Sequence, residues 1–94
     1  MDGKYLIIIQ PEARKDIIAF KKSGNKALFK KIEKILLELQ EHPFLGTGKP
    51  EPLKYDLEWF WSRRINKKDR LIYKVEDEIV TVTVLSAKGH YGEK

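Results

Sequence analysis

Three runs of strand-forming residues follow one another closely in the second half of the chain, and they restrict the fold more than any other feature. The runs cover residues 58–65, 70–75 and 79–85, with short polar turns between them. In the first two runs, neighbouring side chains alternate with the period of two that places them on opposite faces of a sheet. Turns this short join antiparallel neighbours, because a parallel connection needs about a dozen or more residues. The pattern predicts an antiparallel meander.

The first half of the chain has mainly helical patterns. Residues 4–9 form a short apolar run that suits a strand buried on both faces. Pro11 fits the first turn of a helix that Gly24 closes, and Asn25 can cap a second helix that Pro43 stops. The second helix carries an apolar stripe at helical spacing, made of Leu28, Ile32, Ile35, Leu36 and Leu39.

Two amphipathic helices need a sheet to cover their apolar faces. With 94 residues and 41% hydrophobic content, the chain fits one small domain, residues 1–94. The elements sum to an α+β fold of order β-α-α-β-β-β, a helical hairpin packed on a small, mainly antiparallel sheet. A domain of this size leaves no room for a deep, enclosed active site, so chemistry is expected on an open face or in a shallow groove.

Charge and composition narrow the function classes. Nineteen Lys and Arg against fourteen Asp and Glu give a net charge of +5. This balance favours polyanionic partners such as nucleic acid, a ribosomal surface or an acidic protein, although a lysine-rich surface kept for solubility explains it equally well. With no cysteine, disulfides, thiol catalysis and cysteine-ligated zinc are excluded. The apolar run at residues 5–9 is too short for a signal peptide or membrane span, so a cytoplasmic protein without membrane contact is expected.

A candidate carboxylate lies in the Gly/Pro-rich loop before the meander. Glu51 stands between Pro50 and Pro52, whose rings fix the backbone that presents it. The alternative is a solvated loop glutamate, and spacing alone favours that alternative because nothing local indicates desolvation.

Candidate cations lie on the first two predicted strands. Arg63 and Arg64 are adjacent and must point to opposite faces, so one of them at most belongs to a given site. Arg64 and Arg70 flank a short turn and can approach each other on one face if the register allows. Guanidinium groups bind phosphate in a bidentate manner, but ordinary surface cations are an equal alternative. The aromatic residues here favour packing over base stacking: Trp59, Phe60, Trp61 and Tyr73.

His90 follows the last predicted strand and can donate a proton to a leaving alkoxide at neutral pH. The alternative is a chain-end residue without a role. His42 has no partner in view, and two distant histidines without metal-ligand spacing do not predict a metal site. The residues alone therefore support a small basic α+β domain with a candidate metal-free phosphodiester site.

Several longer segments carry a resemblance to a known family. PFLGTGKPEPLK at 43–54, FWSRRI at 60–65, RLIY at 70–73 and the pair His90-Tyr91 closely resemble the YoeB/Txe family. These toxins belong to the RelE/ParE superfamily of type II toxin–antitoxin systems. The resemblance covers nearly the whole chain and implies a RelE-like fold. It also implies a ribosome-dependent endoribonuclease that cleaves mRNA in the ribosomal A site and inhibits translation.

The resemblance also implies a role for each site residue and no cofactor or metal. Glu51 would be the general base for the ribose 2′-OH, Arg70 would stabilise the phosphate, and His90 would be the general acid. The substrate- and phosphate-binding residues that it implies are Lys54, Arg64 and Tyr91. One departure is that Gly92-Glu93-Lys94 follow the His-Tyr pair, which usually ends the family's chains.

The partners implied by the resemblance are the ribosome with its mRNA and an acidic cognate antitoxin of the YefM/Axe/Phd-like kind. Operator DNA would be bound only through the antitoxin complex, and a homodimer is in keeping with relatives. Two other readings remain: a non-catalytic RelE/ParE-fold toxin that inhibits a protein target, and a plain RNA-binding module.

Overall fold

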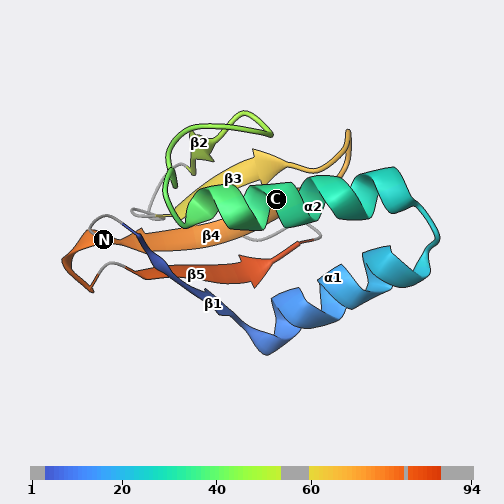
Figure 1. The fold of residues 1–94 in the computed structure, drawn as a ribbon, viewed down its shortest axis with the longest axis horizontal. Coiled ribbons are helices and arrows are strands. Elements are labelled where there is room, and N and C mark those ends of the chain that lie inside the picture. The colour runs from blue at the N-terminus through green and yellow to red at the C-terminus, as the bar shows by residue number, and fades with distance from the viewer. Residues whose placement is uncertain (1–3, 54–59, 80, 88–94) are drawn as a thin grey trace.

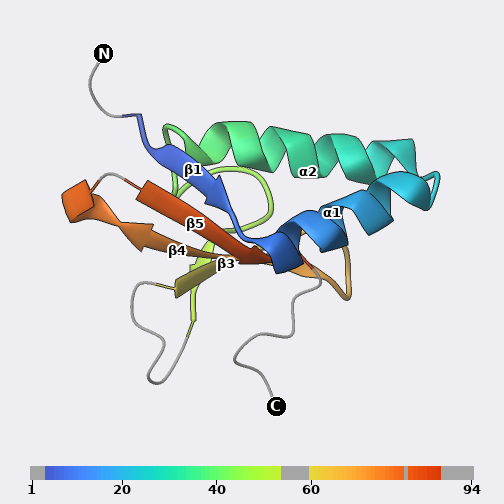
Figure 2. The same cartoon turned by 90° about the horizontal axis from the view of Figure 1, so that it is seen from below.

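Two helices lie on one face of a five-stranded sheet (Figures 1 and 2). The computed structural model describes residues 4–53, 60–79 and 81–87. The elements in chain order are β1 (Leu6–Ile9), α1 (Pro11–Lys22), α2 (Lys26–Leu39), β2 (Glu51–Pro52), β3 (Phe60–Arg64), β4 (Arg70–Glu76), the short 3₁₀ helix η1 (Asp77–Ile79) and β5 (Thr81–Ser86).

The sheet has the strand order β1-β5-β4-β3-β2. β1 pairs with β5 in parallel, and the other neighbouring pairs are antiparallel. The predicted α+β class and the antiparallel meander are therefore confirmed. β2 was not predicted, because a strand of two residues, one of them Pro52, is too short to show the alternation by which strands are recognised. Ile79, predicted to open the last strand, lies in η1 and is 62% exposed.

The predicted helix signals act as expected. Pro11 occupies the first turn of α1, and Gly24 takes a positive φ of 87° after the helix ends. The Asn25 side chain caps α2 by accepting a hydrogen bond from the Leu28 N–H at 3.0 Å. α2 ends at Leu39, four residues before the proline that was expected to stop it.

The core lies between the helices and the sheet. Ile32, Ile35 and Leu39 of the predicted α2 stripe are fully buried, while Leu28 and Leu36 pack at its border. β4 and β5 supply the opposing surface with Leu71, Tyr73, Val75, Val82 and Val84. Burying an aliphatic side chain of this size contributes about 1.5–3 kcal/mol. This packing fixes α2 over the middle of the sheet.

The prediction that the first strand is buried on both faces is wrong. Ile7 and Ile9 of β1 pack against the core, but Leu6 is 63% exposed and Ile8 is 42% exposed. Both helices lie on the other face of the sheet (Figure 2), so β1 is an edge strand with one covered face.

Candidate functional site

Glu51 opens β2, at the edge of the sheet. It pairs with Ser62 of β3, and Pro52 pairs with Trp61. Residues directly opposite each other in an antiparallel pair point to the same face. The exposed Glu51 side chain therefore shares a face with Ser62. The predicted loop around Glu51 is thus a short strand that presents the carboxylate from a fixed register.

Arg64 and Arg70 are directly opposite each other at the end of the β3–β4 hairpin. The register that the sequence left open is therefore the one that brings both cations onto one face. Like charges at directly paired positions repel each other. A phosphate group between two guanidinium groups relieves that repulsion with bidentate hydrogen bonds.

These three side chains share the sheet face that points away from the helices. Arg63 points to the helices, because it is fully buried and contacts Glu38 of α2. Its neighbour Arg64 must then point to the opposite face, together with Ser62 two residues before it. Ser62 in turn pairs with Glu51, so the carboxylate and the two cations lie on three consecutive strands, β2, β3 and β4. Neighbouring strands are spaced about 4.8 Å apart.

The remaining predicted site residues lie outside the described residues. Lys54, His90 and Tyr91 belong to this group. Their roles stay predictions. The last described residue before the histidine, Ala87, is held by α1, because its N–H donates a 2.9 Å hydrogen bond to Asp16 Oδ2.

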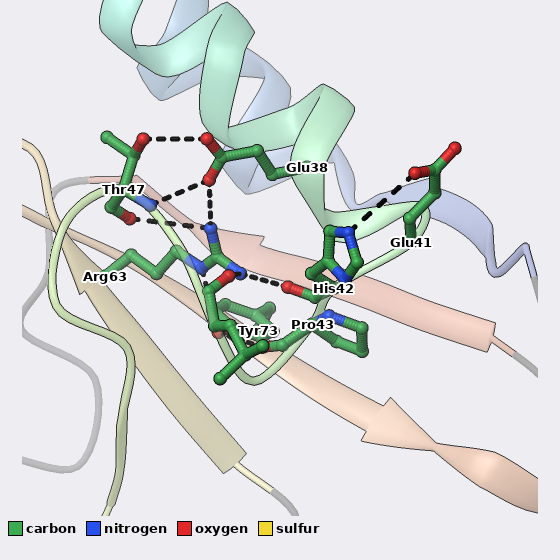
Figure 3. Close-up of polar contacts among 8 residues, drawn as sticks. Glu38, Glu41, His42, Pro43, Thr47, Arg63 and Tyr73 are labelled. Carbon is green, nitrogen blue, oxygen red and sulfur yellow. Dashed lines mark hydrogen bonds and ion pairs between the residues drawn. The ribbon is translucent and has the colours of Figure 1, made fainter.

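Arg63 is not the surface cation that the sequence allowed. Its side chain is fully buried beneath α2 (Figure 3). Nη1 donates to Glu38 Oε1 at 2.7 Å, Nη2 donates to the carbonyls of Leu45 at 2.6 Å and of His42, and Nε donates to the Tyr73 hydroxyl at 3.2 Å. A buried guanidinium is stable only with such partners, so Arg63 is part of the core architecture.

Glu38 joins the helix, the loop and the strand. Besides Arg63, it accepts a 2.8 Å hydrogen bond from the Thr47 N–H and a 2.7 Å hydrogen bond from the Thr47 hydroxyl (Figure 3). Burial alone would raise the pKa of Glu38, but the hydrogen bonds from Thr47 and Arg63 outweigh it and lower the pKa. The carboxylate is therefore held in its charged form.

Tyr73 completes the cluster from β4. Its hydroxyl donates a 2.6 Å hydrogen bond to the Pro43 carbonyl. Burial raises the pKa of Tyr73, and Arg63 offsets part of that rise. The residue alternation in the sequence indicated this cluster, because it placed Arg63 on the same strand face as Trp61 and Ile65. A cation on a core face requires buried acceptors, which the sequence alone did not identify.

The loop between α2 and β2 packs tightly against this cluster. Gly46 and Gly48 have positive φ values of 122° and 88°, and Lys49 has a φ of 51°. A Cβ on Gly46 would collide with Glu38 Oε1 and stand 3.1 Å from Arg63 Nη1. The Gly48 carbonyl accepts a 2.6 Å hydrogen bond from the Arg64 N–H. The glycines adopt these angles without strain, whereas Lys49 is a non-glycine residue in the left-handed region, and such residues cluster at functional sites.

Known proteins place the chain in a family. The family described as "YoeB-like toxin of bacterial type II toxin-antitoxin system" matches residues 9–91. The chain belongs to this toxin family. The resemblance drawn from the sequence segments is confirmed.

Individual relatives of the YoeB-like toxin agree in sequence and in structure. It is 38% identical over 84 residues to Toxin YoeB of Escherichia coli, covering 89% of this chain and 98% of that protein. The structure of a YoeB dimer from Staphylococcus aureus superposes with a TM-score of 0.78 at 36% identity, covering 94% of this chain and 99% of that one. A heterotetrameric YoeB-YefM toxin-antitoxin complex from the same organism gives a TM-score of 0.74 at 36% identity and the same coverage.

Two further observations on the YoeB-like toxin concern membrane-spanning helices and metal ligands. Neither helix among the described residues is long and apolar enough to cross a membrane. Within residues 4–53, 60–79 and 81–87, no three His, Asp or Glu side chains gather closely enough to hold a metal ion.

Proposed function

We propose that this YoeB-like toxin is a ribosome-dependent endoribonuclease that cleaves mRNA in the A site and thereby inhibits translation. The observation that carries the proposal is the strand register. It sets Glu51, Arg64 and Arg70 on the sheet face opposite the helices, on the three consecutive strands β2, β3 and β4. This combination can supply a general base and the positive charge for phosphodiester cleavage by the neighbouring 2′-hydroxyl.

In the proposed reaction, Glu51 removes the proton from the ribose 2′-OH. The 2′ oxygen then attacks the adjacent phosphorus, and the bond from phosphorus to the 5′ oxygen breaks. His90 donates a proton to that leaving oxygen, so the products carry a 2′,3′-cyclic phosphate and a 5′-hydroxyl. General acid–base catalysis of this kind contributes about 10²–10⁴-fold. No metal enters the scheme, because the substrate supplies its own nucleophile.

The arginines act on the charge that develops at phosphorus. Arg70 and Arg64 approach from paired strand positions and offset the additional negative charge of the transition state. Lys54 and Tyr91 are assigned to binding of the phosphate and the flanking nucleotides. Preorganised donors lower the barrier most when they do not have to move during the reaction, and a hairpin provides that rigidity.

The ribosome supplies the orientation of the RNA at this site. Glu51 is exposed, and the sheet face around it carries neither helix. In-line attack needs the RNA strand to be held in one orientation, and an exposed carboxylate supplies few contacts for that. A ribosome that already holds the mRNA in the decoding position provides that orientation, which is worth several powers of ten in rate.

The proposed partners follow from the family and the charge. The Staphylococcus aureus relative was solved with the antitoxin YefM and as a dimer. We extend this to a cytoplasmic toxin of net charge +5 that an acidic cognate antitoxin covers and inhibits. Operator DNA would be reached only through that complex, and the free toxin would form a homodimer.

The test maps mRNA 5′ ends by primer extension in a translating extract to which the protein is added. Glu51→Gln and His90→Ala are expected to slow cleavage about 10²–10⁴-fold while leaving a measurable residual rate. Glu33→Gln, the same change as at Glu51 but on the exposed face of α2, is expected to retain cleavage. A reporter with 2′-deoxyribose at the cut position should resist cleavage. Intact mRNA under active translation would exclude the nuclease and favour a toxin directed at a protein target.

A further inference from the structure

We propose that Arg63 is a positioning residue for the cleavage reaction. Its buried guanidinium fastens the loop of residues 42–48 against β3 and so fixes Glu51 on the same face as Arg64 and Arg70. The inference rests on the proposed function. It concerns a side chain that does not itself reach the substrate face, because Arg63 and Arg64 point to opposite sides of the sheet.

The contacts of Arg63 are concentrated on the loop. Three main-chain carbonyls of that loop, of His42, Leu45 and Thr47, accept from its two terminal nitrogens. Residues 42–48 form no helix or strand, and the backbone supplies only one long hydrogen bond to these carbonyls among the described residues, from the Leu45 N–H to the His42 carbonyl at 3.4 Å. Arg63 therefore supplies from one side chain the donors that regular structure supplies elsewhere.

Residues of two other elements also hold Arg63 and the loop in place. Glu38 of α2 binds both Arg63 and Thr47, so the helix holds the guanidinium and the loop together. Tyr73 of β4 receives the Arg63 Nε–H and donates to Pro43 at the start of the loop. The loop is thus tied at both ends to the rigid part of the fold. We refer to Arg63, Glu38, Thr47 and Tyr73 as the Arg63 clamp.

The path from the clamp to the base is short. Directly after Thr47, the Gly48 carbonyl accepts from the Arg64 N–H at 2.6 Å. Lys49 then takes its left-handed conformation, and Glu51 pairs with Ser62. β2 has only two residues, and the Leu53 N–H after it donates a 2.9 Å hydrogen bond to the Phe60 carbonyl. With so few contacts of its own, β2 also relies on the preceding loop for its register. A shift of the loop would move Glu51 relative to the arginines on β3 and β4.

The chemistry of the clamp fits positioning better than stability alone. Replacing a buried ion pair with well-packed apolar groups is often neutral or stabilising, so its presence is weak evidence for stability. A planar guanidinium, with five N–H donors in a fixed fork, defines the place of each acceptor. A lysine would supply a charge and three donors from one atom, and it would leave loop carbonyls unpaired.

The test measures single-turnover cleavage at saturating programmed ribosomes. Arg63→Lys is expected to lower the rate constant about 10²-fold, the scale of a misplaced catalytic group, while the ribosome concentration for half-maximal rate stays within about threefold. In a Glu51→Gln background, the same change is expected to cost less than about twofold, because the base that it positions is already absent. Circular dichroism and thermal unfolding verify that each variant is folded.

A second pair of variants disturbs the clamp without removing Arg63. Gly46→Ala places a Cβ against Glu38 and Arg63, whereas Gly24→Ala, also at a positive φ, meets nothing within 4 Å. Gly46→Ala is expected to lose about as much rate as Arg63→Lys and to speed amide exchange at residues 46–49 at least about tenfold. Gly24→Ala should do neither. This pair carries the test if Arg63→Lys does not fold.

The outcomes separate the inference from the proposed function. A wild-type protein that leaves mRNA intact overturns both. If the wild type cleaves, then folded Arg63→Lys and Gly46→Ala variants with wild-type rates overturn the positioning role alone. A loss from Arg63→Lys that is equally large in the Glu51→Gln background also overturns it, because the arginine would then act independently of the base.

Discussion

At the scale of single residues, the fold depends on a few polar side chains that the core encloses. Arg63 has no exposed side-chain surface, and the Glu38 side chain keeps only 22% of its own. Removing one partner of such a pair leaves a buried charge without compensation. The polar cluster therefore makes the protein sensitive to changes that would be harmless on an exposed face.

Acid is expected to weaken the fold through Glu38. Its pKa is lowered in the folded state from an ordinary value of 4.5, so the unfolded chain binds the proton more readily. The stabilisation is present above about that value and is lost as the pH falls through the lowered folded pKa. Glu38→Gln should destabilise the protein at neutral pH by about 3 kcal/mol. It should also flatten the acid side of the stability profile, measured by urea unfolding from pH 7 to pH 3.

The exposed Glu33 on the same helix provides the control for that experiment. Glu33→Gln should change the free energy of unfolding by less than about 0.5 kcal/mol. If Glu38→Gln left both the neutral stability and the slope with pH as they are in the wild type, the assigned ion pair would be wrong.

Tyr73 gives a second prediction at this scale. Tyr73→Phe keeps the buried ring but removes the donor to the Pro43 carbonyl and an acceptor for Arg63. We expect a loss of about 1–3 kcal/mol in the free energy of unfolding, because buried polar groups are left unpaired. Chemical denaturation measures it. A variant as stable as the wild type would mean that the Pro43 carbonyl finds another donor.

At the scale of elements, α2 and the hairpin of β3 and β4 hold three of the four residues of the Arg63 clamp. α2 presents Glu38 near its C-terminal end, while Asn25 caps the opposite end. Substitutions at the two ends of α2 should therefore have different effects. A change at Glu38 disturbs the Arg63 clamp, whereas a change at Asn25 lowers the stability of the helix alone.

Removing the cap is expected to affect stability without affecting catalysis. Asn25→Ala should cost about 1 kcal/mol, because the Leu28 N–H loses its side-chain acceptor. Single-turnover cleavage well below the unfolding temperature should remain within twofold of the wild type. A large loss of rate in the folded variant would show that the start of α2 takes part in ribosome binding.

Much of the strand arrangement could be predicted from residue patterns, and the parts that could not be predicted have physical causes. Alternation in residues 60–65 and 70–75 placed Arg64 apart from Arg63, and a short turn made the approach of Arg64 and Arg70 conceivable. The Arg63 clamp was not predictable, since its four members come from α2, the following loop, β3 and β4. The short pairing of Glu51 with Ser62 also has no periodic signal of its own. The assignment of Glu51 as a base came from the family resemblance and remains a prediction.

At the scale of the whole molecule, the net charge of +5 matters for encounter more than for the chemical step. The apparent affinity for programmed ribosomes should fall steeply between 50 and 200 mM salt, as expected for contacts to RNA phosphates. The cleavage rate at saturation should change by less than about threefold. Filter binding and single-turnover kinetics over that range measure the two quantities. A salt-independent affinity would point to apolar docking.

The parallel pairing of β1 with β5 determines when the sheet can be completed as the chain is synthesised. Leu6 meets Thr81, and the Tyr5 hydroxyl reaches Asp77 across a separation of 72 residues. A nascent chain can form α1, α2 and the β3–β4 hairpin, but the sheet stays incomplete until β5 has left the exit tunnel. A fragment ending at Ile79 should lack cooperative thermal unfolding. The complete sheet, with the proposed site on one of its faces, would thus form only after β5 has been synthesised.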